Sequence, residues 1–115
     1  MQTREIPPSE WPVFLNSFNS RHQGWLMNLH VFGPDIGAQV EGSLLVLEGL
    51  IDEYDEKHGN TIMIMAGARP ADHVTRSISR ATEISLEKTD SGEDVALSIK
   101  GEDGNRTLLT FPYAD

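Results

Sequence analysis

The sequence of 115 residues contains no cysteine. Without a thiol the chain can form no disulfide, no thiolate nucleophile and no zinc–sulfur centre, a composition that suits the reducing cytosol. It also lacks any run close to the roughly 20 apolar residues that a membrane-spanning helix needs. The first five residues, MQTRE, lack the apolar stretch of a secretion signal. We therefore expect a cytoplasmic protein without a membrane segment.

Basic residues are scarce. Nine Lys and Arg stand against 18 Asp and Glu, so the formal net charge is -9. Such a surface repels nucleic acid and anionic membranes, which makes both unfavoured partners. The length fits one domain, residues 1–115, which is large enough to bury a core without covalent staples.

The beginning of the chain predicts one amphipathic helix. A polar lead-in covers residues 1–8, and Ser9 is a candidate N-cap. Apolar side chains then recur at helical spacing, at Trp11, Phe14, Leu15 and Phe18. Gly24 supplies a stop signal. The pattern predicts a helix over residues 9–22 that packs its aromatic stripe against the rest of the protein.

The remainder, residues 25–111, alternates apolar and polar residues as strands do. The turn signals Asp90-Ser91-Gly92 and Asp103-Gly104 predict a three-strand meander from about residue 81 to 111. Earlier strands are expected at 25–32, 38–43, 45–52, 61–66 and 73–78, with Ala38 and Val40 inward and with Leu45, Leu47 and Ile51 on one side. The predicted fold is mainly β (α+β), with the helix followed by six to eight mostly antiparallel strands. Closure into a small barrel would remove exposed strand edges.

Several short motifs carry a resemblance. They are TREIP at 3–7 with Glu10-Trp11 and Phe14, Gly24-Trp25-Leu26, GPD at 33–35 with GAQVE at 37–41, and TLLTF at 107–111. Together they resemble a family of small bacterial proteins of unknown function, over nearly the whole chain. The resemblance implies a bacterial cytoplasmic protein and brings no activity, cofactor or site residue. A looser, fold-level likeness links the N-terminal helix and LEGLID at 47–52 to Sm-like barrels, without the residues that those proteins use for RNA.

The best candidate ligand site is a basic segment. It consists of Arg69, His73, Arg76 and Arg80, opposed only by Asp72. Arg76 and Arg80 are an even number of residues apart, so they can share a face of an extended chain and hold a phosphate or carboxylate. Alternatively, these cations pair with acidic residues of the same chain, for which Glu41, Glu48 and Asp52 are the candidates.

An acidic connection offers weak metal candidates, which are Asp52, Asp55, Glu56 and His58. Hard cations need several converging oxygen atoms, and the spacing does not match a calcium loop. A solvated hairpin is the simpler interpretation, so we expect no metal. No phosphate loop or nucleotide fingerprint implies a cofactor. His30 lacks partners for a catalytic triad, and Trp25 and Phe32 are expected in the core or against the helix.

These observations favour a non-enzymatic binding or interaction module. We also consider self-association into a homo-oligomer, or an unidentified protein partner, because Met63 and Met65 suit an adaptable apolar contact. Two alternatives stay open. One is an Sm-like protein that binds single-stranded RNA through Arg69, Arg76 and Arg80, and the other is a small metal-dependent hydrolase that uses the acidic connection. The residues specify neither the ligand nor the oligomeric state, nor whether the arginines bind a ligand or form ion pairs.

Overall fold

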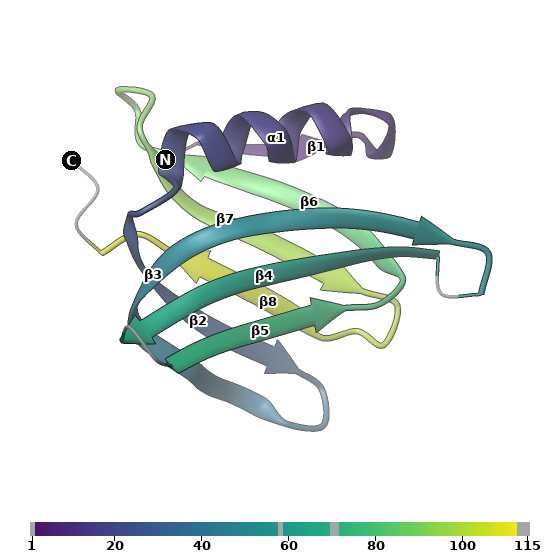
Figure 1. Ribbon diagram of the computed structural model, residues 1–115. Helices are drawn as coiled ribbons and strands as arrows, with labels where there is room; N and C mark the ends of the chain where they lie inside the picture. The colour runs from purple at the N-terminus through teal and green to yellow at the C-terminus, as the bar shows by residue number, and fades with distance from the viewer. Residues whose placement is uncertain (1, 58, 70–71, 113–115) are drawn as a thin grey trace.

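The alternating runs of the sequence form strands, and the aromatic stripe forms a helix (Figure 1). The computed structural model describes residues 2–57, 59–69 and 72–112, without the side chains at 68, 69 and 72. The described elements are β1 (Gln2–Ile6), the 3₁₀ turn η1 (Pro8–Glu10), α1 (Trp11–His22), β2 (Leu26–Gly33), β3 (Gly37–Asp55), β4 (Gly59–Arg69), β5 (Asp72–Ile78), β6 (Ala81–Lys88), β7 (Asp94–Gly101) and β8 (Arg106–Thr110).

All described strands belong to one antiparallel sheet, in the order β1-β6-β7-β8-β2-β3-β4-β5. The long β3 bends, so that β3, β4 and β5 lie in front of β6, β7 and β8 with the core between them (Figure 1). The predicted mainly β fold, with its meander of β6, β7 and β8, is confirmed. The sheet curls towards a barrel without closing, because no described ladder joins β1 to β5.

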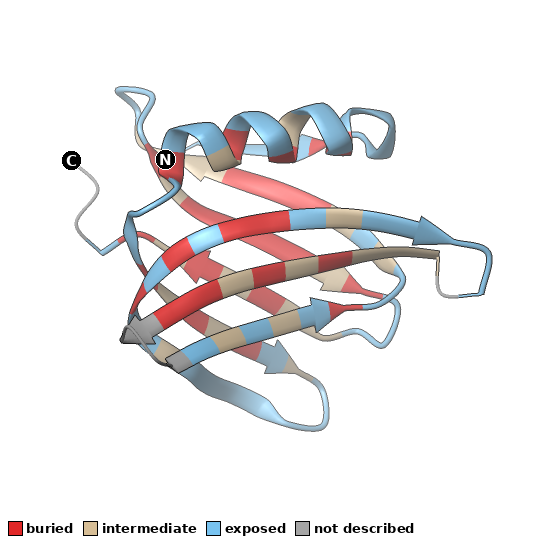
Figure 2. Ribbon diagram, in the orientation of Figure 1, coloured by how far each residue is buried: buried red, intermediate tan, exposed pale blue. Residues whose placement is uncertain are grey.

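Helix α1 lies along one side of the space between these layers, with its buried face inward and its exposed face outward (Figure 2). Its inward residues Trp11, Leu15 and Phe18 are at most 2% exposed and join the main hydrophobic cluster. The Trp11 indole also donates a hydrogen bond to the carbonyl of Ile6 at 2.9 Å. Burial of each large apolar side chain contributes about 1.5–3 kcal/mol, so this stripe holds the helix in place.

The start of the chain departs from the prediction. The expected lead-in over residues 1–8 contains β1, which pairs with β6 from Gln2 to Ile6. The helix begins at Trp11, and Ser9 lies in η1, with no side-chain cap on α1. Only Ile6 of β1 is buried, so this strand carries no alternating apolar pattern. Its position comes from backbone hydrogen bonds to an open sheet edge.

The two strands expected at 38–43 and 45–52 are one strand, β3, with a bulge near Gly49. The extra residue reverses the alternation, so Leu50 is buried at 2% exposure whereas Ile51 is 38% exposed. The prediction that Ile51 shares a side with Leu45 and Leu47 is therefore wrong. The predicted inward placement of Ala38 and Val40 is also wrong, because the β2–β3 hairpin extends beyond the core and exposes both residues.

Candidate functional site

A hollow of about 590 Å³ opens where the β5–β6 and β7–β8 turns meet. Its walls contain Arg76, Ser77, Ile78, Ser79 and Arg80 from one chain segment, and Glu102, Asp103 and Asn105 from the other. These two segments of the chain come together here because β5 and β7 approach each other. Two of the four predicted basic residues, Arg76 and Arg80, line this hollow.

Arg76 points into the molecule from β5. It is the register partner of Ile64, which is fully buried, and the side chains of such a pair lie on the same face of the sheet. The half-buried Arg76 donates from Nε to Oγ1 of Thr107 on β8 at 3.3 Å. Among the described residues no carboxylate lies within ion-pair distance of Arg76. Half-buried charges are usually paired, so an unmatched guanidinium beside a hollow is the unusual feature of this site.

Arg80 has a different role, because its guanidinium connects three turns. It donates from Nη2 to the carbonyl of Lys57 at 2.8 Å, and its Nε lies 3.6 Å from Oε2 of Glu102. The Arg80 carbonyl accepts a hydrogen bond from the backbone of Glu102 at 3.0 Å. Arg80 has a positive φ of 52°, a conformation that costs a non-glycine residue energy and fixes the turn after β5. Arg80 thus has partners within its own chain, although Glu102 was not one of the acidic residues considered for it in the sequence.

Of the remaining two basic residues, His73 lies away from the hollow. His73 lies near the other end of β5, beside Gly67 of β4, and its Nδ1 is 3.2 Å from Oε2 of Glu48 on the outer surface. Its odd separation from Arg76 places the two side chains on opposite faces of the strand. The side chain of Arg69 lies outside the described residues. The structure thus brings together Arg76 and Arg80 and separates His73 from them.

The described residues of the acidic connection lie in different surroundings. The half-buried Asp52 accepts two contacts from the Asn60 amide, at 3.1 and 3.3 Å. Asp55 and Glu56 are exposed, and His58 lies outside the described residues. Within the described part of the chain, no group of three or more His, Asp or Glu side chains is placed to hold a metal ion.

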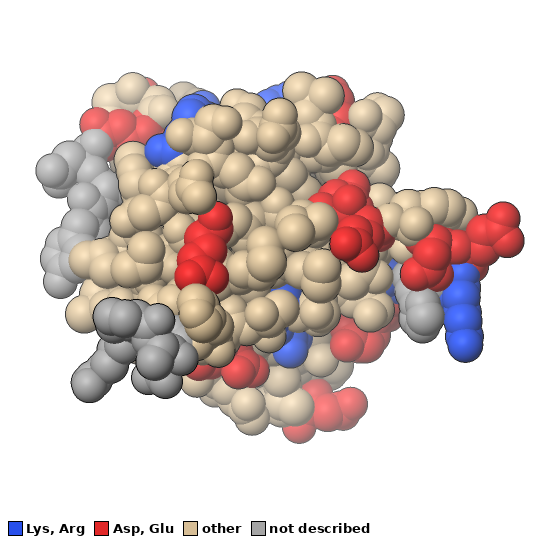
Figure 3. All heavy atoms as spheres, viewed as in Figure 1, with Lys and Arg blue, Asp and Glu red and all other residues tan. Residues whose placement is uncertain are grey.

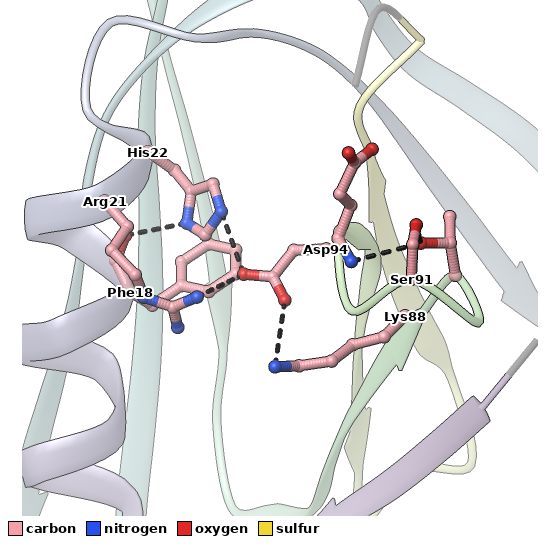
Figure 4. A network of polar contacts seen from close by, with 8 residues as sticks. Phe18, Arg21, His22, Lys88, Ser91 and Asp94 are labelled. Atoms are coloured by element: carbon pink, nitrogen blue, oxygen red, sulfur yellow. Dashed lines mark hydrogen bonds and ion pairs between the residues drawn. The ribbon is translucent and has the colours of Figure 1, made fainter. Parts of the chain in front are cut away.

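The structure contains a buried polar cluster around Asp94 that the sequence did not predict (Figure 4). Asp94, at the start of β7, has a side chain only 4% exposed, and three basic groups surround it. Oδ2 accepts from Arg21 Nη1 and lies 3.0 Å from Nε2 of His22, and Oδ1 lies 3.7 Å from Nζ of Lys88. In the sequence Asp94 follows a turn signal and is typical of a solvated residue, so no local pattern indicated its burial.

His22 is part of this cluster rather than an exposed helix-end residue. Its Nδ1 lies 2.9 Å from the carbonyl of Phe18, and its ring stacks on Phe111 with centroids 4.8 Å apart. Burial lowers the pKa of His22, and its contacts with the Phe18 carbonyl and Asp94 act in the opposite direction. The cluster fastens the end of α1 to β7.

The aromatic residues outside the helix are less buried than expected. Trp25 is 41% exposed, although it packs edge-on against His22 and Phe111. Phe32 is 38% exposed and stacks beside His30, with ring centroids 6.3 Å apart. The prediction of a core or helix-docking role is thus met in part by Trp25 and is wrong for Phe32, because the hairpin carries Phe32 away from the core.

The motifs that suggested a family extend from β1 to the end of β8, and a family model covers the same region. The model of DUF5335, a family of unknown function, matches residues 2–114. The chain belongs to this family. The resemblance to a small family of unknown function is thereby confirmed. Neither the curated proteins nor the solved structures yielded a match. Within the described residues of this DUF5335 member, none of the helices has the length and apolar character needed to cross a membrane.

Proposed function

We propose that this protein is a non-catalytic binding module that takes a small anion, a carboxylate or a phosphate, in the hollow beside Arg76. The observation that carries the proposal is the half-buried guanidinium of Arg76, which faces this hollow without a carboxylate partner among the described residues. An anion that entered the hollow would supply the missing charge, and a desolvated charge pair is much stronger than an exposed one.

The geometry suits recognition by a forked donor. The hydrogen bond from Nε to Thr107, which is 1% exposed, anchors the Arg76 side chain on a rigid strand. Neither Nη group of Arg76 has a hydrogen-bond partner among the described residues, and a guanidinium binds carboxylates and phosphates through such paired donors. Ser79 and Asn105 add neutral polar groups to the walls.

Two acidic residues in the walls would oppose an anion if they were unengaged. Each is held by the chain itself. Glu102 lies beside Arg80, and Asp103 accepts hydrogen bonds from the backbone and the side-chain amide of Asn105, at 2.9 and 3.2 Å. These contacts reduce the repulsion that an incoming anion would meet.

The test is a calorimetric titration of the protein with inorganic phosphate, pyrophosphate and citrate at low salt. We expect saturable binding of at least one of them, and Arg76→Gln should weaken it by about tenfold or more, since a hydrogen bond to a charged group is worth roughly 1.5–3 kcal/mol. Arg76→Lys should restore binding only in part, because an ammonium lacks the fork. Lys100→Gln is the matched control, which removes one cation from β7 outside the hollow.

Equal affinities of Arg76→Gln and Lys100→Gln would contradict the proposal, and so would the absence of heat with all three anions. A short single-stranded RNA in the same titration tests the RNA alternative. If RNA binds tightly while the small anions do not, the nucleic-acid hypothesis replaces ours. A cytoplasmic location stays a prediction of the sequence.

Self-association is a second candidate, supported by apolar side chains on the outer surface of β2, β3 and β4. The exposed members are Leu26, Leu44, Val46 and Ile51, which are 38–49% exposed. Ile51 pairs across the sheet with Met63, which is half-buried on the same outer face. Over β3 and β4 the acidic groups are separated by wide areas without charged side chains (Figure 3).

Light scattering coupled to size-exclusion chromatography tests this second candidate. We expect a dimer or larger species whose fraction rises with protein concentration, and Ile51→Glu should reduce that fraction. Thr75→Glu adds the same charge on the neighbouring strand β5 and is the control for net charge. A monomer at high concentration would refute self-association.

A further inference from the structure

A second hollow, of about 430 Å³, lies between α1 and the β1–β6 pair. Its walls combine apolar groups, from Phe14 and Leu86, with the basic groups of Arg4, Arg21 and Lys88, and with the hydroxyl of Ser17. The volume falls within the range of about 300–1,000 Å³ that small-molecule sites occupy. Three of the chain's nine basic residues therefore line one apolar hollow on an otherwise acidic protein.

Two of the cations that line this hollow share a single carboxylate partner among the described residues. Arg21 and Lys88 both face the single carboxylate of Asp94, with His22 on its remaining side. Arg4 is balanced by Glu10 at 3.0 Å, so it adds no net charge. One carboxylate cannot neutralise two permanent cations, and the excess lies where the hollow meets the C-terminal end of α1. Basic atoms are visible over that end of the helix in Figure 3.

The two cations line the hollow and stay partly exposed, whereas their counter-ion is buried. The Asp94 side chain is 4% exposed, whereas those of Arg21 and Lys88 are 44% and 36% exposed. Asp94 Oδ1 has no hydrogen-bond partner in the described structure, and Lys88 Nζ stands 3.7 Å from it, beyond hydrogen-bond distance. Figure 4 shows Arg21 reaching Asp94 from the helix and Lys88 reaching it from the sheet. Lys88 is thus near its counter-ion without being hydrogen-bonded to it, and can turn towards a ligand.

We propose that this hollow binds an amphipathic anion, a hydrocarbon chain that ends in a carboxylate. The carboxylate would lie against Arg21 and Lys88, where charge-assisted hydrogen bonds are strongest. The hydrocarbon chain would cover the half-buried Phe14 and the exposed Val13, which also lines the hollow, and their apolar surface gains from leaving water. Ser17, which is exposed on α1, also lines the hollow. This site is separate from the Arg76 hollow and does not depend on the function proposed for it.

The experiment titrates the full chain with three probes, followed by calorimetry and by amide shifts in NMR spectra. Octanoate carries both features, octanol carries the chain without the charge, and propionate carries the charge with almost no chain. We expect octanoate to bind saturably and at least about tenfold more tightly than either of the others, because each of them lacks one of the two contacts. The shifted amides should belong to α1, β1 and β6.

Two variants locate the site. Lys88→Gln removes one cation while Asp94 keeps Arg21 and His22, and octanoate binding should fall by about tenfold. Ser17→Phe puts a bulky ring into the wall of the hollow from an exposed helix position without changing any charge, and it should abolish octanoate binding even if Lys88→Gln proves unstable. Lys100→Gln, elsewhere on the sheet, should bind octanoate as the unaltered chain does.

Equal affinity for octanoate and octanol would overturn the proposal, since the cations would then play no part. Unchanged octanoate binding by Ser17→Phe would also overturn it. Loss of octanoate binding in Arg76→Gln but not in Lys88→Gln would assign the ligand to the first hollow instead, which separates the two proposals.

Discussion

Asn19 provides a sharp test of how the helix is attached to the sheet. Its side-chain amide forms two hydrogen bonds with the backbone of Leu50 on β3. Nδ2 donates to the Leu50 carbonyl at 2.8 Å, and Oδ1 accepts from the Leu50 amide at 2.8 Å. The Asn19 side chain thus satisfies both backbone groups of Leu50, as a neighbouring strand would, just after the bulge at Gly49. Asn19→Ala removes both bonds and leaves two half-buried backbone groups without their partner.

Each such bond contributes about 0.5–1.5 kcal/mol net, so the loss is about 1–3 kcal/mol. The substitution offsets part of this loss of stability, because alanine has a higher helix propensity than asparagine, by up to about 0.7 kcal/mol. An open hollow of about 500 Å³ beside Asn19 and Leu50 lets water reach the vacated groups, which places the cost in the lower part of the range. We expect Asn19→Ala to lower the free energy of unfolding by about 1–2 kcal/mol.

Urea unfolding followed by tryptophan fluorescence and circular dichroism measures this difference. Asn16→Ala is the matched control, because Asn16 is exposed one turn earlier on the same helix. It should be neutral or slightly stabilising, since only helix propensity changes. If the two variants differ by less than about 0.5 kcal/mol, the pair of bonds to Leu50 does not hold the helix in place.

Two further predictions concern the interior. Phe18→Ala should cost about 3–5 kcal/mol in urea unfolding, because Phe18 is fully buried, while Phe14→Ala should cost clearly less, because Phe14 is half-buried. Equal costs would mean that the stripe docks differently. Burial lowers the pKa of His22 below its ordinary value of 6.5, so the unfolded chain binds a proton before the folded chain does. The His22 contribution to stability is thus present above pH 6.5 and is lost as the pH falls. The drop in the free energy of unfolding between about pH 7.5 and 5.5 should be smaller in His22→Gln, and an equal drop would exclude His22 as its source.

Part of the candidate site was visible in the sequence. The odd separation of His73 and Arg76 already predicts opposite faces of a strand, and the structure places them so. The even separation of Arg76 and Arg80 predicted a shared face of one extended strand. Arg80 does not lie on that strand, so the alternation of strand side chains does not explain why the two residues meet. The strand β5 ends at Ile78, and the left-handed turn at Arg80 returns that residue to the same hollow. Thr107, which anchors Arg76, is 31 residues away, a distance over which no local pattern gives a signal.

The helix stripe from Trp11 to Phe18 and the β6–β7–β8 meander were determined by the sequence alone. Both depend on periodicity and turn chemistry, which act between neighbouring residues. Tertiary structure alone decided the pairing of β1 with β6, the inversion of β3 at its bulge and the burial of Asp94. The polar strand β1 is positioned by backbone hydrogen bonds to the open edge of the sheet. The bulge in β3 moves every later side chain of that strand to the other face. An aspartate becomes buried here because two basic residues of α1 join the one that faces it on the neighbouring strand β6, and that outcome is set by the packing of α1 on the sheet.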